Sequence, residues 1–179
     1  MKTALVVMIL VVVLIAAGLL ALGRKQKNSQ DKRANVESPG GTFSIMRGEV
    51  DGRPVIAIID TKRRDLRGRQ GLPFFLSLSS PLIGPTSEGL PTRSDSNSLN
   101  EWEDSVEAKL QSVSKFAFVG RVTWNRNREL LYYIDSPKPA VEILQTLSDA
   151  HSTRPFAFAC ERDEMWTKAD FWLNRQPSP

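Results

Sequence analysis

The sequence has very few of the residues that carry metal and nucleophilic chemistry. Its 179 residues include a single cysteine, Cys160, and a single histidine, His151. A disulfide scaffold needs paired cysteines, and a zinc site of cysteine and histidine needs more ligands than these two. A catalytic triad would have to use His151, and no serine or cysteine nucleophile stands in a recognisable turn beside it. The sequence therefore predicts no catalytic residues, no metal site and no cofactor.

The net positive charge of the chain is concentrated in one short segment. The chain has 24 basic and 20 acidic residues and a formal net charge of +4. Residues 24–33 contain five basic residues and one acidic residue, so this segment alone carries +4. Residues 34–179 contain 18 basic and 19 acidic residues, so their net charge is −1. The one remaining basic residue is Lys2. A near-neutral remainder is not typical of a nucleic-acid-binding protein, so we expect no nucleic acid as a partner.

An uncharged N-terminal segment precedes this basic cluster. Residues 4–22 as a helix would be about 28 Å long, close to the hydrocarbon thickness of a bilayer. We therefore predict a transmembrane helix at residues 4–23; the alternative is a signal peptide cleaved after Ala21-Leu22-Gly23. The basic residues that follow favour a folded domain on the cytoplasmic side, against a periplasmic or secreted one. They are expected at the membrane surface: Arg24, Lys25, Lys27, Lys32 and Arg33.

The rest of the chain divides into a tether, a domain and a tail. Residues 24–41 have no apolar periodicity and predict a basic flexible tether, residues 42–175 a single α+β domain, and residues 176–179 a disordered tail. Alternation and β-branched residues predict strands at 43–50, 54–61, 73–80, 116–124, 129–135 and 156–160. Turn signals at Asp51-Gly52 and Asn125-Arg126-Asn127 predict hairpins.

Two longer helices and one short helix complete the predicted domain. An apolar stripe at Leu99, Trp102, Val106, Leu110 and Val113 predicts the first helix. Its start is expected at Ser98, which forms a capping-box pattern with Glu101, or nearer Ser94 or Asp95. The acidic residues of this helix are expected on a solvated face: Glu101, Glu103, Asp104 and Glu107. The second helix follows Ser136-Pro137, and the short one surrounds Trp166.

The order of these elements predicts the fold. From about 73 to 161 it is β-α-β-β-α-β, the order of a ferredoxin-like sandwich with two helices on one face of an antiparallel sheet. The N-terminal hairpin either extends this sheet or covers its open face. The expected fold class is therefore α+β, with an extra N-terminal hairpin, a short C-terminal helix and one transmembrane helix.

Several local features resemble the bacterial domain-of-unknown-function family numbered 695. They include Gly48 with Asp51-Gly52-Arg53-Pro54, Leu90-Pro91-Thr92, Glu103-Asp104, Phe118-Val119-Gly120-Arg121, Thr123, Arg128-Glu129, and Tyr132-Tyr133 with Asp135. The resemblance covers roughly residues 42–173 and supplies no reaction. It departs near the end, where members often have Asp-Pro-x-Trp and this chain has Asp163-Glu164-Met165-Trp166.

One basic cluster inside the domain is the most suggestive surface feature: Lys62, Arg63, Arg64, Arg67 and Arg69. We expect a solvated loop that touches lipid, in preference to a nucleic-acid site. The anchor and the lack of a catalytic constellation predict a membrane-anchored, non-catalytic domain. Its expected partners are the lipid bilayer and an unknown protein or a second copy of the chain; no small-molecule substrate is identified.

Two alternatives stay open. The first is an enzyme with a dispersed active site that includes Asp60, Glu129, Asp135 and His151. The second is a nucleic-acid-binding or exported domain.

Overall fold

The structure is a computed structural model that describes residues 43–66, 71–150 and 154–174. These residues belong to one compact unit, Asn35–Pro179. The predicted transmembrane helix (4–23), the tether with its five membrane-surface residues, the tail and His151 all lie outside the described residues. None of the described helices combines the length and the hydropathy needed to cross a membrane.

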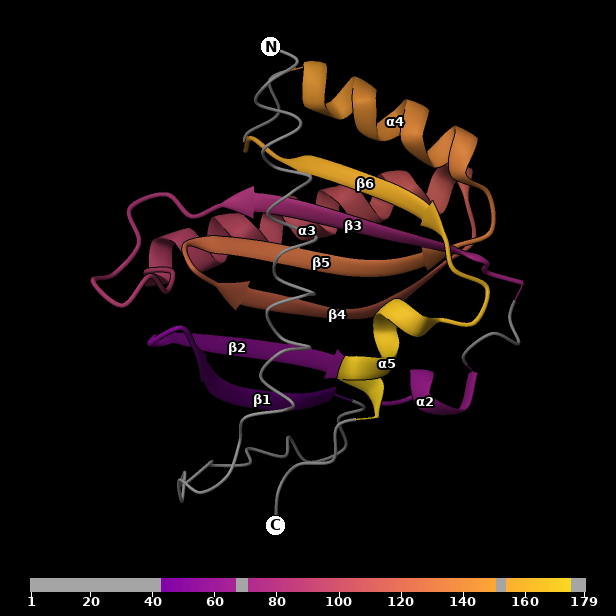
Figure 1. The fold of residues 1–179 in the computed structure, drawn as a ribbon. Coiled ribbons are helices and arrows are strands. Elements are labelled where there is room, and N and C mark those ends of the chain that lie inside the picture. The colour runs from indigo at the N-terminus through magenta and orange to yellow at the C-terminus, as the bar shows by residue number, and fades with distance from the viewer. Residues whose placement is uncertain (1–42, 67–70, 151–153, 175–179) are drawn as a thin grey trace. The chain divides into compact units, whose positions relative to one another are not determined.

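A six-stranded antiparallel sheet forms the centre of the fold (Figure 1), with the strand order β1-β2-β4-β5-β3-β6. The strands are β1 (Phe43–Val50), β2 (Arg53–Asp60), β3 (Phe74–Pro81), β4 (Phe116–Trp124), β5 (Asn127–Ile134) and β6 (Ala157–Arg162). The helices are α2 (Arg63–Leu66), α3 (Arg93–Val113), α4 (Pro137–Asp149) and α5 (Thr167–Leu173). The predicted α+β class and the predicted order of elements are confirmed; the one-turn helix α2 lies in a segment predicted as a loop.

Local turn chemistry explains both hairpins. Asp51 and Gly52 join β1 to β2 with φ angles of 52° and 72°. Asn125 and Arg126 join β4 to β5 with φ angles of 48° and 64°. Two successive positive φ angles give a turn whose twist matches that of the flanking strands. The N-terminal hairpin lies beside β4, so it extends the sheet on that side.

Helices α3 and α4 pack on one face of the sheet, which we call the helical face. The α3 side chains Leu99, Trp102, Val106 and Leu110 are buried there, as predicted from their spacing. Ala140 and Leu144 of α4 join the same cluster, together with alternate residues of β3 and β5. This cluster is one of the two apolar cores of the described domain.

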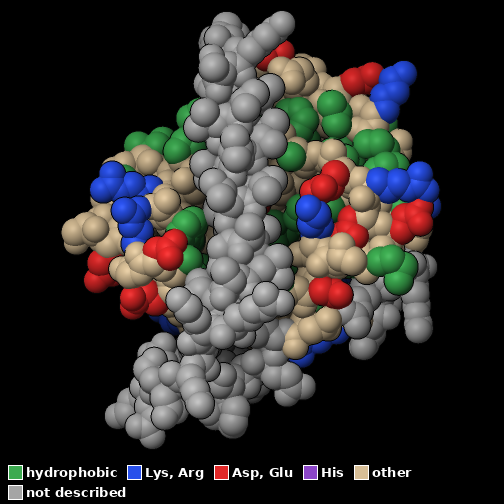
Figure 2. All heavy atoms as spheres, in the orientation of Figure 1, with side chains coloured by type: hydrophobic (Ala, Val, Ile, Leu, Met, Phe, Trp, Pro, Cys, Tyr) green, Lys and Arg blue, Asp and Glu red, His purple; other side chains and the backbone are tan. Residues whose placement is uncertain are grey.

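Helix α5 packs on the opposite face, which we call the α5 face. Its Leu173 and Ala169 and the preceding Trp166 pack with residues of β2, β4, β5 and β3. Figure 2 views the molecule from this side, and its visible charged side chains of both signs are interspersed. The two faces together explain why Tyr132 and Tyr133, adjacent on β5, are both fully buried: they point into different cores.

The start of α5 is fixed without the proline that family members often have. The carboxylate of Asp163 accepts hydrogen bonds from the backbone N–H groups of Thr167 (3.0 Å) and Lys168 (2.9 Å). It also accepts one from the Tyr133 hydroxyl at 2.5 Å. Trp166 has a φ of 58° and stacks on the Tyr133 ring with centroids 3.9 Å apart. A side-chain cap and a buried aromatic stack therefore set this helix end.

A bulge interrupts β4 and changes which face its side chains occupy. The β4–β5 register shifts between Phe118 and Gly120. Before the shift, Phe118 packs on the helical face; after it, Val122 packs on the α5 face. Arg121 and Thr123 therefore point to the helical face. Without the bulge, strict alternation from Phe118 would have placed both side chains on the α5 face.

Gly120 is required at this bulge by the closeness of β2. A Cβ on Gly120 would lie 2.5 Å from Ile59 Cδ1 and 2.6 Å from the Ile58 carbonyl oxygen. The strands can approach this closely only because the residue has no side chain.

Of the two starts predicted for α3, the one near Ser94 or Asp95 is close to the observed start and the one at Ser98 is wrong, and the prediction that all its acidic residues are solvated is wrong too. The helix starts at Arg93, where Thr92 Oγ1 accepts a hydrogen bond from Asp95 N at 3.3 Å; Ser98 does not cap it. The acidic residues are also not all solvated, because Glu103 is buried and pairs with Arg121. Glu107 is half-buried and accepts a hydrogen bond from the Tyr132 hydroxyl at 3.2 Å.

Candidate functional site

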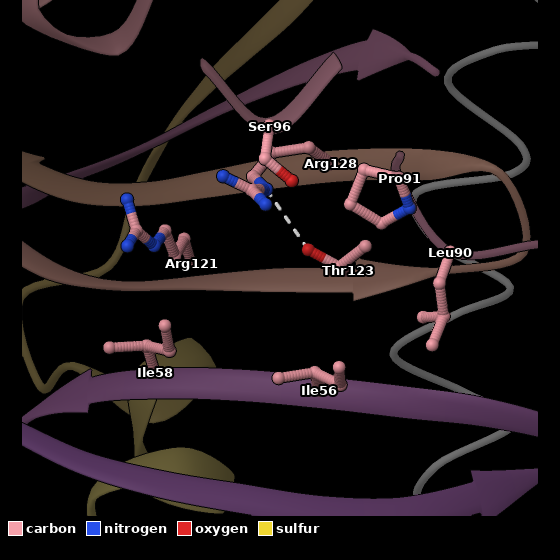
Figure 3. Close-up of a pocket in the computed structure, with 8 residues that line it drawn as sticks. All are labelled: Ile56, Ile58, Leu90, Pro91, Ser96, Arg121, Thr123 and Arg128. Carbon is pink, nitrogen blue, oxygen red and sulfur yellow. Dashed lines mark hydrogen bonds between the residues drawn. The ribbon is translucent and has the colours of Figure 1, made fainter. Parts of the chain in front are cut away.

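Two pockets lie along α3 on the helical face, and we call them the arginine pocket and the acidic pocket. The arginine pocket has a volume of about 260 Å³ (Figure 3). Its walls come from β2, β4, β5, the loop before α3 and the first turn of α3: Ile56, Ile58, Leu90, Pro91, Ser96, Arg121, Thr123 and Arg128. Residues from four separate parts of the chain thus meet at one concave surface.

Arg128 is a buried polar residue of the arginine pocket. The residue is 7 % exposed, and its Nε donates a hydrogen bond to Thr123 Oγ1, its cross-strand neighbour, at 2.9 Å. Its Nη1 is buried and has no hydrogen-bond partner in the described structure. Burial, followed by the charge of Arg121, lowers the pKa of Arg128 to about 10. The guanidinium is therefore a positive charge held in a site that does not fully solvate it.

Arg121 is the second guanidinium of this pocket. Its Nη1 donates to Glu103 Oε2 at 2.9 Å and to Asn100 Oδ1 at 3.3 Å, both on α3. Its Nε is buried and, like Arg128 Nη1, has no acceptor among the described residues. Among the described residues, one other buried side-chain nitrogen has no hydrogen-bond partner, Trp102 Nε1. The pocket thus holds two donors that are buried but unused.

A buried ion pair holds the loop that closes the pocket. Arg154 Nη2 donates to Asp95 Oδ1 at 2.6 Å, and both side chains are almost fully buried. Arg154 also donates to Ser98 Oγ and to Ser80 Oγ, each at 3.0 Å. The other carboxylate oxygen of Asp95 accepts from Ile83 N at 3.0 Å. These bonds tie the first turn of α3 to β3 and to the loop that carries Leu90 and Pro91.

The acidic pocket lies on the other side of the Arg121–Glu103 ion pair. It is about 670 Å³ in volume and more open than the arginine pocket. Its charged lining residues are Asp60, Arg63, Glu103, Glu107 and Lys115, with Phe43, Phe116 and Phe118 among the apolar ones. Burial, followed by the charge of Glu103, raises the pKa of Glu107. The two pockets thus lie on either side of this ion pair, one lined by two arginines and the other with mainly carboxylates among its charged residues, and we call the two together the groove.

The predicted basic cluster is partly used to hold the fold. Arg63 Nε lies 3.2 Å from Asp60 Oδ2 and donates to the Phe118 carbonyl at 3.1 Å. Arg64 Nε donates to the Leu173 carbonyl at 2.7 Å, which attaches α2 to the end of α5. Lys62 is exposed, and Arg67 and Arg69 lie outside the described residues.

Of the dispersed active site, His151 lies outside the described residues; Asp60 and two partners of Asp135 line the acidic pocket, whereas Glu129 lies on the other face of the sheet. Asp135 accepts hydrogen bonds from Ser114 Oγ (2.7 Å) and Lys115 N (3.1 Å). Glu129 lies on β5 between the helical-face residues Arg128 and Leu130, so it points to the α5 face. Burial raises the pKa of Glu129 to about 7. Within the described ranges, no three side chains of His, Cys, Asp and Glu gather as metal ligands would. Cys160 is half-buried against the helical-face core, and burial raises its pKa to about 11.

The comparison with protein families identifies the domain. The model described as "Family of unknown function (DUF695)" matches residues 43–173. The chain belongs to this family. No curated protein and no solved structure matches it. Some of the family features found in the sequence lie at the groove: Leu90, Pro91, Arg121, Thr123 and Arg128 line the arginine pocket, and Glu103 pairs with Arg121.

Sequence reasoning noted these residues as features of the family but not as a site. Gly120 is a local signal that could have indicated the site, because a glycine inside a strand often marks a bulge, and this bulge turns Arg121 and Thr123 toward the pocket. The partners that complete the pocket, Ile56 on β2 and Ser96 on α3, are far from Arg128 in the sequence.

Proposed function

We propose that the chain is a membrane-anchored, non-catalytic domain that binds a protein partner or a second copy of itself through the groove beside α3. The observation that carries the proposal is the pair of buried guanidinium nitrogens, Arg121 Nε and Arg128 Nη1, that have no acceptor in the described structure. Natural proteins rarely keep such donors unused, and binding sites are where they do so.

The shape and charge of the groove support binding by a macromolecule. Its two pockets lie side by side along α3, and they differ in charge. A partner that complements both ends is held in one orientation, because like charges in the reversed orientation repel. Half-buried apolar side chains such as Ile58 and Phe118 provide the surface whose burial stabilises the complex.

The fold and location form part of the same proposal. The strand order β4-β5-β3-β6 with α3 and α4 on one face supports a ferredoxin-like core. The apolar segment at 4–23 supports a single-pass anchor, and the basic residues after it support a cytoplasmic domain on a tether at the lipid surface. A reporter fused at residue 35 distinguishes cytoplasm from periplasm, and N-terminal sequencing shows whether the segment is cleaved.

Site-specific photo-cross-linking in native membranes tests the binding function. A photoreactive amino acid replaces either Gln111, an exposed residue that lines the groove, or Ser105, an exposed α3 residue that does not. We expect a discrete cross-linked product from position 111 that is absent from position 105. Its mass identifies a partner or a second copy of the chain. No product at position 111, or the same products at both positions, would overturn the proposal.

A further inference from the structure

The arginine pocket contains one positive charge that forms no ion pair with a described side chain. None of the ion pairs among the described residues includes Arg128. The charge of Arg121 is balanced by Glu103, and that of Arg154 by Asp95. A buried charge without a counter-charge disfavours the fold, and an anion that enters the pocket removes this cost.

Two buried donors without acceptors in the described structure belong to the side chains of this pocket. They are Arg128 Nη1 and Arg121 Nε, and the two residues lie on neighbouring strands. Figure 3 shows these two residues and Thr123 on β4 and β5, facing Ile56 and Ile58 on β2, with Leu90 and Pro91 at one end. The site therefore has a polar wall of guanidinium groups and apolar walls beside it.

We propose that the arginine pocket binds a carboxylate attached to an apolar group, and that the carboxylate belongs to the protein partner. The inference rests on the proposed function for the source of the carboxylate, but the pocket's preference is tested separately. A single negative charge matches the single unpaired charge of Arg128, whereas a doubly charged phosphate exceeds it. Guanidinium groups bind carboxylates through paired N–H donors.

The size and lining of the pocket limit what accompanies the carboxylate. A volume of about 260 Å³ admits a group of side-chain size. Ile56, Ile58, Leu90 and Pro91 present half-buried apolar surface to that group. Two kinds of protein carboxylate fit this chemistry, a C-terminus that ends in an apolar residue and an acidic side chain.

Calorimetric titration of the full-length chain in detergent micelles at low salt tests the inference. N-acetyl-leucine represents the C-terminal carboxylate, and N-acetyl-glutamic acid α-amide represents the side chain. N-acetyl-leucinamide is the uncharged control, and inorganic phosphate is the competing anion. We expect one of the carboxylates to bind with a Kd on the order of 1 mM and the uncharged amide at least roughly tenfold more weakly. The tighter of the two carboxylates identifies the source.

Three variants assign the binding to this pocket. Arg128→Met should weaken carboxylate binding by at least about tenfold. Arg47→Met should change it much less, because Arg47 is exposed and is not among the residues that line the pocket. Ile56→Glu places a carboxylate in the pocket wall and should also abolish binding of the probe.

The outcomes separate this inference from the proposed function. Phosphate or N-acetyl-leucinamide binding as tightly as both carboxylates, or unchanged binding in Arg128→Met, overturns the carboxylate preference, whatever the cross-linking shows. Carboxylate binding that depends on Arg128, together with no cross-link at position 111, supports the pocket's chemistry and removes the protein partner as its source.

Discussion

Replacing Arg128 by methionine is expected to stabilise the unliganded domain. Burial lowers the pKa of Arg128 from 12.5 to about 10, so the folded state disfavours its positive charge by about 3 kcal/mol relative to the unfolded chain. Methionine fills similar space without a charge. The change also removes the hydrogen bond from Arg128 Nε to Thr123 Oγ1, which contributes about 1 kcal/mol. The net expectation is a gain of about 2 kcal/mol in the free energy of unfolding, or roughly 8 °C in Tm.

Urea unfolding and thermal scans of the full-length chain in detergent micelles measure this change. Arg47→Met is the matched control, because it removes the same group from an exposed position in the same cross-strand row. The control is expected to stay within about 0.5 kcal/mol of the parent. A saturating carboxylate ligand should stabilise the parent but not Arg128→Met.

A loss of stability in Arg128→Met would refute the reasoning. If the free energy of unfolding fell by about 1 kcal/mol or more while Arg47→Met stayed unchanged, the guanidinium would be stabilising the fold through its contacts. Its buried charge would then need no ligand to explain it. A gain of stability with a loss of binding is the pattern of a residue retained for function.

Three further predictions concern the structure around the groove. Gly120→Ala should destabilise the domain by about 3 kcal/mol in urea unfolding, because the added Cβ would clash with β2. The control Gly48→Ala should cost about 1 kcal/mol or less, because its added Cβ would lie 3.6 Å from the nearest side chain. Asp95→Ala should cost about 3–5 kcal/mol because it removes the buried carboxylate that pairs with the Arg154 charge; a loss below 1 kcal/mol would contradict the ion pair's role. Glu129→Gln should gain stability over the parent as pH rises from about 4.5 to 7, by up to about 3 kcal/mol above pH 7, because the raised pKa makes ionisation of Glu129 unfavourable in the folded state; parallel pH profiles would contradict it.

The strands and turns were predictable because their signals are local. The ranges 43–50 and 116–124 match β1 and β4, and the turn residues Asp51-Gly52 have the positive φ angles that their types predict. Alternation and turn chemistry depend on residues within a few positions of one another, so they survive in the sequence without knowledge of the fold.

The sequence left the start of α3 open between Ser98 and the region of Ser94 and Asp95, because residues far away in the sequence decide between them. Residues 92–98 contain several side chains that can cap a helix, and the local pattern favoured Ser98 with Glu101. In the structure, Ser98 Oγ accepts a hydrogen bond from Arg154, 56 residues later, and Thr92 caps the helix. A capping pattern identifies candidates, whereas tertiary hydrogen bonds choose among them.

The arginine pocket was hidden from the sequence for a geometric reason. Alternation from Phe118 puts residues 120, 122 and 124 on the helical face, and it puts Arg121 and Thr123 on the opposite one. The bulge before Gly120 reverses this assignment, so that Arg121 reaches Glu103 on α3 and Thr123 receives the hydrogen bond of Arg128. The same reversal turns Glu103 from an expected solvated residue into a buried partner. One extra residue in one strand thus brings together the polar side chains of the site, and Gly120, which lets β2 approach, is the sequence feature on which that arrangement depends.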